Sequence, residues 1–262
     1  MIFRYLMFCL FYFSITHSNA ELNKEIHWQK LNYIEQSFYE IALQNEYNSK
    51  QTHIRKWNKP LLIYIKHEVG DKELHLRLVK AHLTHLSEIT GLTFSYTQHK
   101  ADANLTIFLT RSNQVNSLIR QEISTNAVKQ LKNSVCLANI QTNQNSEIIK
   151  ALVILPVDRA RMHGKLISCV VEELTQILGL PNDSKTIYPT IFSDRNIYKL
   201  LTGLDYLLLK LLYLPEIKSG MTKHQIKPII QKQLKQWNKD GTIKNAQKNI
   251  VKGDLYPLTG YR

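Results

Sequence analysis

The sequence predicts an α+β fold, in which a twisted mixed β-sheet carries two packed helices and is followed by a smaller helical part. Two longer segments, 71–91 and 159–178, have apolar side chains at helical spacing and supply the two helices. Shorter runs rich in Leu, Ile, Val and Tyr have the length and composition of strands. The predicted order is strand, helix, three or four strands, helix, and the strand candidates are residues 60–67, 92–98, 103–110, 135–142 and 148–156.

Residues with strong positional preferences mark the ends of these helices. Asp71 offers an N-cap to the first helix and Gly91 a C-cap, while Gly179 ends the second helix. Residues 112–133 are polar and are expected to be helical or irregular. Outside the sheet, apolar side chains at helical spacing predict three further helices, within residues 21–45, 201–215 and 220–237.

The N-terminus has the features of a secretory signal peptide. Arg4 precedes an apolar run from Tyr5 to about Ile15, and the small residues Ser18 and Ala20 stand at the cleavage positions. The run is well short of the roughly 20 residues that cross a bilayer, which makes a retained anchor the weaker alternative. We therefore expect secretion across the inner membrane into the periplasm, and no later segment predicts a membrane span.

Removal of the signal peptide leaves enough chain for one domain with extensions. The segment 218–252 is strongly basic within this chain, whose formal charge is +13. We divide the chain into a signal peptide (1–20), an N-terminal helix and linker (21–50), a folded domain (51–238) and a basic C-terminal tail (239–262).

The basic segment suggests an anionic partner. Between Lys218 and Lys252 there are nine lysines and one acidic residue, Asp240. Phospholipid head groups, envelope polysaccharide or nucleic acid would suit such a surface, although lysines also simply keep a polar segment solvated. Basic residues do not alternate with stacking aromatic residues, so dedicated nucleic-acid binding is not predicted.

Two cysteines remain after cleavage, because Cys9 belongs to the signal peptide. In an oxidising compartment Cys136 and Cys169 most simply form one disulfide, and the alternative is a pair of buried free thiols. The bridge would stabilise the fold by roughly 3 to 4 kcal/mol through its effect on the unfolded chain.

The stretch CVVEELTQILGLPND, residues 169–183, has the frame of the zinc-protease pattern H-E-x-x-H-x-x-G-x-x-H without its histidines. The pattern positions are held in order by Glu172, Glu173, Gln176, Gly179 and Asn182. An amide is a poor zinc ligand and a single carboxylate leaves zinc under-coordinated, so hydrolysis by the usual zinc mechanism is not expected.

Other roles for these side chains stay open. Oxygen ligands from Glu172, Gln176, Asn182 and Asp183 suit a weak calcium or magnesium site, an amine or a hydroxyl-rich ligand. The alternative is a structural role, in which these groups hydrogen-bond to neighbours. Glu173 occupies the general-base position and would activate water in a hydrolase.

The histidines of segment 71–91 offer a second, weaker candidate site. His82 and His85 lie three positions apart and could chelate a metal, but a solvated helix face explains them better. Asp205 is interpreted as a surface or capping group.

The order of elements resembles metzincin-type zinc peptidases, in which a sheet backs an active-site helix that ends in a glycine turn. A closer resemblance is to the bacterial domain of unknown function 2927, on the segments CVVEELTQILGLPNDS, PTIFSD, LTGLDYLLLKLLY and SGMTKHQIKPII. The resemblance is specific over residues 169–230 and looser back to Arg55-Lys56-Trp57; residues 21–50 and 240–262 lie outside it. Thr190 stands where serine is usual in that family.

These resemblances imply a zinc-free, metzincin-like domain that keeps the geometry of an active-site helix. The expected function is binding of an envelope component or a partner protein outside the cytoplasm, without a cofactor. The alternative is a peptidase-like hydrolase that uses Glu173 with a non-standard metal or none.

Overall fold

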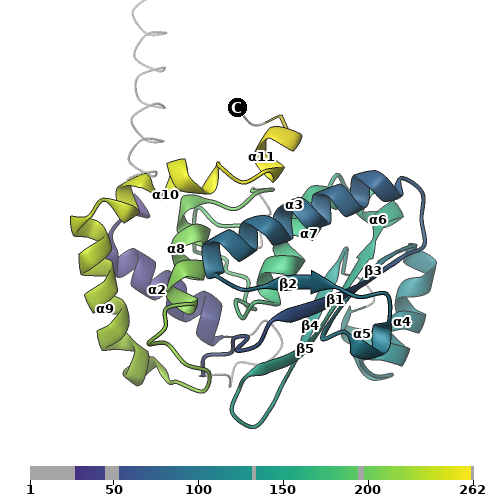
Figure 1. Ribbon diagram of the computed structural model, residues 1–262, viewed down its shortest axis with the longest axis horizontal. Helices are drawn as coiled ribbons and strands as arrows, with labels where there is room; N and C mark the ends of the chain where they lie inside the picture. Colours follow the sequence, from purple (N-terminus) through teal and green to yellow (C-terminus); the bar gives the residue numbers. More distant parts are fainter. Residues whose placement is uncertain (1–26, 45–52, 132–133, 194–197, 261–262) are drawn as a thin grey trace, which may run out of the picture.

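The computed structural model describes residues 27–44, 53–131, 134–193 and 198–260 (Figure 1). The predicted signal peptide, residues 1–20, lies outside this part of the chain and stays a prediction. None of the described helices is long and apolar enough to cross a membrane.

A five-stranded mixed sheet forms the centre of the fold, as the sequence predicts. The strand order is β2-β1-β3-β5-β4, and β4 is antiparallel to β5 while the other pairs are parallel. β4 is thus one edge of the sheet. The strands are β1 (Leu61–His67), β2 (Phe94–Tyr96), β3 (Leu105–Thr110), β4 (Leu137–Thr142) and β5 (Ile148–Pro156).

Helices cover both faces of the sheet, which explains why β3 and β5 are apolar along nearly their whole length. Ile107 and Val153, which are register partners, point into the main core, where α3 (Lys72–Thr90) and α7 (Leu166–Gln176) pack together. Phe108 and Ile154 point the opposite way, into a smaller core with α4 (Val115–Glu122) and α5 (Ala127–Leu131). The segment expected to be helical or irregular therefore forms the second cover of the sheet.

The predicted helix 159–178 is two helices, so this expectation is wrong. α6 (Val157–Met162) ends near Gly164, whose φ of 64° belongs to the left-handed region, and α7 starts at Leu166. A glycine adopts this conformation without the steric cost that other residues meet, and it ends a helix for that reason. The break turns α7 so that it lies beside β4.

The first sheet helix ends at Gly91 as expected, but Asp71 does not cap its other end through the side chain. Asp71 has a φ of 56° and makes no side-chain cap hydrogen bond. Its carboxylate instead pairs with Arg161 at 2.7 Å and so connects α3 to α6.

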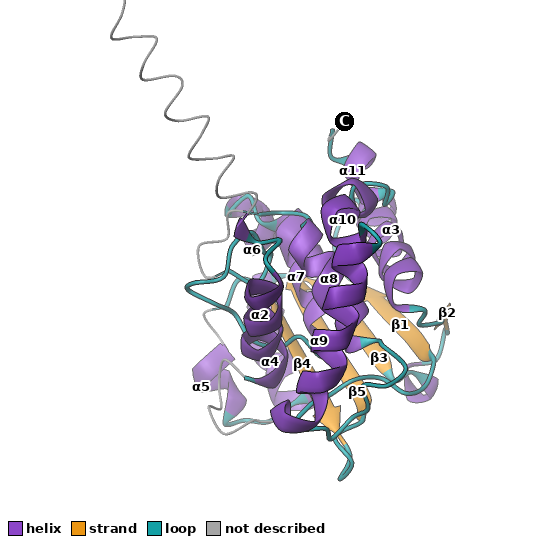
Figure 2. Ribbon diagram, turned by 90° about the vertical axis from the view of Figure 1, so that its left-hand side faces the viewer, coloured by secondary structure: helices purple, strands orange, loops and turns teal. Residues whose placement is uncertain are grey.

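A helical part packs beside the sheet (Figures 1 and 2), with the strands behind α8 and α9 in the view of Figure 2. The nearly fully buried α8 is its centre and contacts α2, α3 and α10. The helices are α2 (Leu31–Leu43), α8 (Gly203–Leu212), α9 (Lys223–Lys239), α10 (Thr242–Ile250) and α11 (Leu255–Leu258).

Within the segment 239–262, expected as a basic tail, residues 239–260 are described and belong to this folded part. α10 buries Ile243, Ala246 and Ile250, and α10 contacts α8 and α9. Its apolar residues recur every three or four positions, so one face of a short helix is covered while the lysines stay outside.

Candidate functional site

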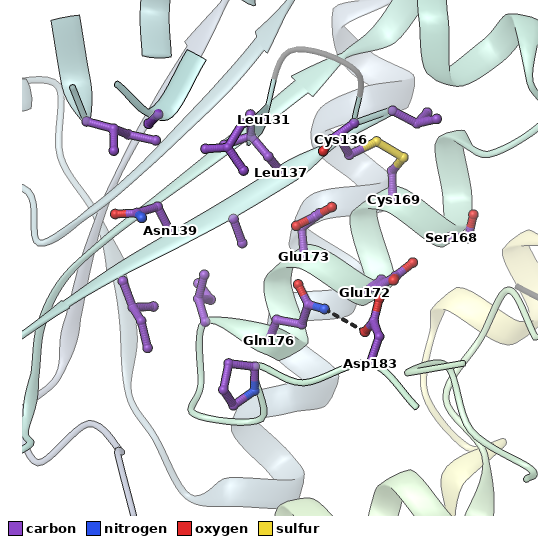
Figure 3. A pocket seen from close by; sticks show the side chains of 18 of the residues that line it. Leu131, Cys136, Leu137, Asn139, Ser168, Cys169, Glu172, Glu173, Gln176 and Asp183 are labelled. Atoms are coloured by element: carbon purple, nitrogen blue, oxygen red, sulfur yellow. Dashed lines mark hydrogen bonds between the residues drawn. A yellow bond between two sulfur atoms is a disulfide. The ribbon is translucent and has the colours of Figure 1, made fainter. Parts of the chain in front are cut away.

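A cavity of about 470 Å³ lies between the edge strand β4 and helix α7. α5 and β4 supply one wall, and α7 with the turn that follows it supplies the other. Figure 3 shows Glu173 and Gln176 on the side of α7 that faces Leu137 and Asn139 of β4. The predicted site helix therefore lines this cavity between sheet and helix.

Helical periodicity sorts the side chains of α7 between core and cavity. Val170 and Leu174 are buried in the main core, whereas Glu172, Glu173 and Gln176 line the cavity. Residues three and four positions apart share a helix face, so the frame read from the sequence brings these three polar groups together. The Glu173 residue is only 8% exposed, which makes it the most enclosed of the acidic side chains in the cavity.

The Cys136–Cys169 disulfide forms part of the same wall. It joins the residue before β4 to the first turn of α7, with a Cα–Cα distance of 5.9 Å. The predicted pairing is confirmed, and the bridge holds the two walls of the cavity together at one end.

The four predicted ligand-binding residues do not all meet. Glu172, Gln176 and Asp183 line the cavity, and the Gln176 side-chain amide donates to Asp183 Oδ1 at 3.0 Å. Asn182 is buried outside the lining, with its backbone N–H bonded to the carbonyl of Ile41 in α2 at 3.3 Å. After the glycine turn, Asp183 therefore lines the cavity, whereas Asn182 packs against α2.

Gly179 is needed in this turn for two separate reasons. Its φ of 114° is a conformation that only glycine adopts readily. A Cβ at this position would also lie 2.0 Å from the backbone oxygen of Arg55. The turn is therefore pressed against the segment that precedes β1.

That preceding segment, residues 55–57, is bonded to the ends of two helices. Trp57 Nε1 donates to the carbonyl of Ile177 at 2.8 Å, just after α7. Lys56 Nζ donates to the carbonyls of Leu212 and Ile217 at 2.9 and 3.0 Å, at and beyond the C-terminus of α8. A cation suits the negative end of a helix dipole, although burial lowers the pKa of Lys56 to about 8.

Arg55 is a charged cavity residue that the sequence did not indicate. It lines the cavity, the residue is 7% exposed, and burial lowers the pKa of its guanidinium to about 10. Its Nε and Nη2 atoms are buried and have no hydrogen-bond partner among the described residues. The zinc-protease frame has no basic position, so the only earlier indication was the looser part of the family resemblance.

The side chains do not fit a zinc ion. Of the three positions that correspond to zinc ligands, Gln176 donates its amide to Asp183 and Asn182 lies outside the cavity lining. Within the described part of the chain, no three His, Cys, Asp or Glu side chains are grouped so as to hold a metal. A zinc site needs at least three such donors converging on one point, so no zinc-dependent step is assigned here.

The family model described as "Protein of unknown function (DUF2927)" matches residues 31–232. The chain belongs to this family. The DUF2927 match starts at α2, whereas the sequence resemblance reached back only to the segment of Arg55. The hydrogen bond from Asn182 N–H to the carbonyl of Ile41 connects α2 to the turn after α7. No curated protein matches the chain.

Proposed function

We propose that this DUF2927 protein is a non-catalytic binding domain of the periplasm that holds an extended segment of a partner protein between β4 and α7. The observation that carries the proposal is the position of the cavity along an edge strand of the sheet. An edge strand presents backbone N–H and C=O groups that can pair with an added strand. Side chains of the added strand would then alternate between solvent and the cavity.

The polar groups of α7 fit this role as contacts to the bound segment. Glu172, Glu173 and Gln176 face the cavity from one helix, and the disulfide and the glycine turn hold that helix against the sheet. Rigid support of this kind reduces the entropy lost on binding. The proposal needs neither zinc nor a resident calcium or magnesium ion.

The alternative is a hydrolase in which Glu173 acts as the general base. Its carboxyl group is enclosed in the cavity, as a base that takes a proton from water requires. What disfavours this alternative is the donor set, because it lacks the ligands that would activate a water molecule in the peptidases that share the frame.

A peptide-binding experiment tests the proposal. Pools of degenerate, fluorescently labelled hexapeptides would be titrated against the mature protein and followed by polarisation, with concentrations up to about 1 mM. Ala138 is half-buried on β4 and lines the cavity, so Ala138→Trp fills the space and should weaken the best peptide by about tenfold or more.

The matched control is Ala101→Trp, the same change at an exposed alanine outside the cavity lining, which should leave binding unchanged. Absence of any peptide binding, or equal binding by both variants, would reject the proposal. Mass spectrometry of the same pools after long incubation tests the alternative. Peptide cleavage that disappears in Glu173→Gln would establish a hydrolase instead.

The basic surface supports a second contact, with an anionic membrane or polysaccharide. Eight lysines of α9, α10 and the turns that flank them are exposed: Lys223, Lys227, Lys232, Lys235, Lys239, Lys244, Lys248 and Lys252. Such a surface attracts anionic head groups that lie within one Debye length, about 8 Å at physiological salt, because salt screens the attraction at longer distances. Co-sedimentation with vesicles of anionic and of zwitterionic lipid, at low and high salt, measures this contact.

A further inference from the structure

We infer that Arg55 binds a carboxylate group of the ligand that enters the cavity between β4 and α7. The inference rests on the proposed function, because it assigns one chemical group of the bound segment to one side chain of the same site. The carboxylate belongs either to an acidic side chain of that segment or to its C-terminus.

The arrangement of free donors on Arg55 indicates this ligand. Nε and Nη2 lie next to each other on one edge of the planar guanidinium, and both are buried without a partner among the described residues. Two parallel N–H donors on that edge match the two oxygens of a carboxylate. Buried donors are nearly always satisfied, so this edge is where a group from outside the chain is expected.

Backbone contacts hold the segment around Arg55 in place. Ile54 N–H donates to the carbonyl of Met221 at 2.9 Å, and the carbonyl of Ile54 accepts from Gly220 at 2.8 Å. The carbonyl of Arg55 itself lies against Gly179. The backbone of this segment is therefore fixed, and the Arg55 side chain contributes to the wall of the cavity with two buried donors that no described residue accepts.

The other charges of the cavity select the kind of anion. Glu172, Glu173 and Asp183 line the same space, and their negative charge opposes any free polyanion. A carboxylate carries a single negative charge, so these acidic side chains repel it less than they repel a phosphate. If the carboxylate belongs to a larger ligand, backbone contacts of that ligand also contribute to binding. We therefore expect a carboxylate in preference to a phosphate.

Thermal unfolding of the mature protein with a simple carboxylate is the first test. If sodium acetate binds with a Kd of about 10 mM, then about 100 mM should raise the unfolding midpoint by roughly 3 to 6 °C relative to sodium chloride at equal ionic strength. Arg55→Met should unfold at a similar or higher temperature without ligand, since it removes two buried donors that have no partner among the described residues, and should lose the acetate shift.

Lys165→Met is the matched control, because it removes another positive side chain that lines the same cavity. This variant should keep the acetate shift. An acetate shift that is absent in the unsubstituted protein, or equal in Arg55→Met, would overturn the inference. So would a larger Arg55-dependent shift with sodium phosphate than with acetate.

The second test uses the best hexapeptide from the pools, in forms with a free or amidated C-terminus and with Asp or Glu replaced by Asn or Gln. Arg55→Met should lower the affinity by about tenfold or more for peptides that carry the recognised carboxylate and should leave the affinity of the other forms unchanged. Comparison of the two series shows whether this carboxylate is the C-terminus or a side chain. Equal losses for all forms would contradict the inference. If no peptide binds but the acetate shift depends on Arg55, the proposed peptide binding fails and the carboxylate site stands.

Discussion

The two histidines in the middle of α3 show how a polar residue can be hidden in the core. His82 and His85 are 1% and 5% exposed, so the expected solvated face is wrong. The Thr175 hydroxyl donates to the carbonyl of Val171 at 2.5 Å, which leaves His82 Nε2 as the donor to both groups, at 3.0 and 3.1 Å. His82 is thus a neutral ring that connects α3 to α7, and burial lowers its pKa to about 3.

This residue should make the protein less stable in mild acid. In the folded chain His82 takes up a proton only near pH 3, whereas an unfolded histidine does so near 6.5, so the unfolded state binds more protons in between. Between pH 7.5 and pH 5 the free energy of unfolding should fall by about 2 kcal/mol through His82 alone. Urea unfolding at the two pH values measures this loss.

His82→Gln keeps a side-chain N–H donor but does not titrate, so it should lose about 2 kcal/mol less than the unsubstituted protein over the same pH interval. His99→Gln, at an exposed histidine, is the control and should change the pH dependence little. If His82→Gln and the unsubstituted protein lost the same amount, the assigned role of His82 would be wrong.

At the scale of single elements, the N-terminus of α8 contains a buried carboxylate. Asp205 is fully buried, completes the capping box with Thr202, and also accepts from the hydroxyl of Thr190 at 2.5 Å and the N–H of Ile191 at 3.2 Å. Asp205 was predicted to be a surface or capping group, and the capping role is confirmed while the surface position is wrong. Thr190, the departure from the usual serine, keeps the hydroxyl that this carboxylate needs.

Removal of that hydroxyl should destabilise the helix start. Thr190→Val keeps the shape of the side chain but takes away one donor to a buried charge, at a cost of about 1 to 3 kcal/mol. Thr190→Ser restores the donor and should lose less than about 1.5 kcal/mol, from one methyl group. Urea midpoints of the two variants give the comparison, and a larger loss for serine than for valine would contradict this account.

The break between α6 and α7 illustrates where periodicity misleads. Apolar residues continue at compatible spacing across Gly164, so the local pattern reads as one helix from 159 to 178. A glycine is compatible with either a helix interior or a helix end. Here the left-handed turn at Gly164 allows α7 to pack against β4 and α3, and this packing was not visible in the segment itself.

At the scale of the whole molecule, the C-terminal residues complete the core instead of extending from it. Tyr256 donates its hydroxyl to the carbonyl of Leu201, and the ring of His85 packs so closely on Gly253 that a Cβ there would lie 2.3 Å from it. α10 and α11 therefore connect α8 to α3. The predicted tail is the last layer of the helical part.

Deletion of residues 241–262 should therefore prevent stable folding. It uncovers α8 and removes five buried apolar side chains worth roughly 1 to 3 kcal/mol each, which is comparable to the total stability of a typical domain. These side chains are Ile243, Ala246, Ile250, Leu255 and Tyr256. Far-UV circular dichroism with thermal unfolding measures the loss.

Deletion of residues 259–262, beyond α11, is the control and should unfold at nearly the same temperature as the complete mature chain. A chain lacking 241–262 that unfolded cooperatively at an unchanged temperature would show that this segment is a tail after all.

The sequence by itself determined the features that depend on local periodicity or on simple counting. The strands, the first sheet helix, the shared face of Glu172, Glu173 and Gln176, and the pairing of Cys136 with Cys169 all follow from spacing or counting along the chain. Family membership was visible for the same reason, because its signature is a set of short spaced segments.

Only the tertiary structure decided which groups meet across long separations. Arg55 lines the cavity because its carbonyl packs on Gly179, more than a hundred positions away, and Asn182 leaves the cavity because α2 takes its backbone N–H. Such contacts depend on how complete helices and strands pack, and no local pattern of residues encodes them.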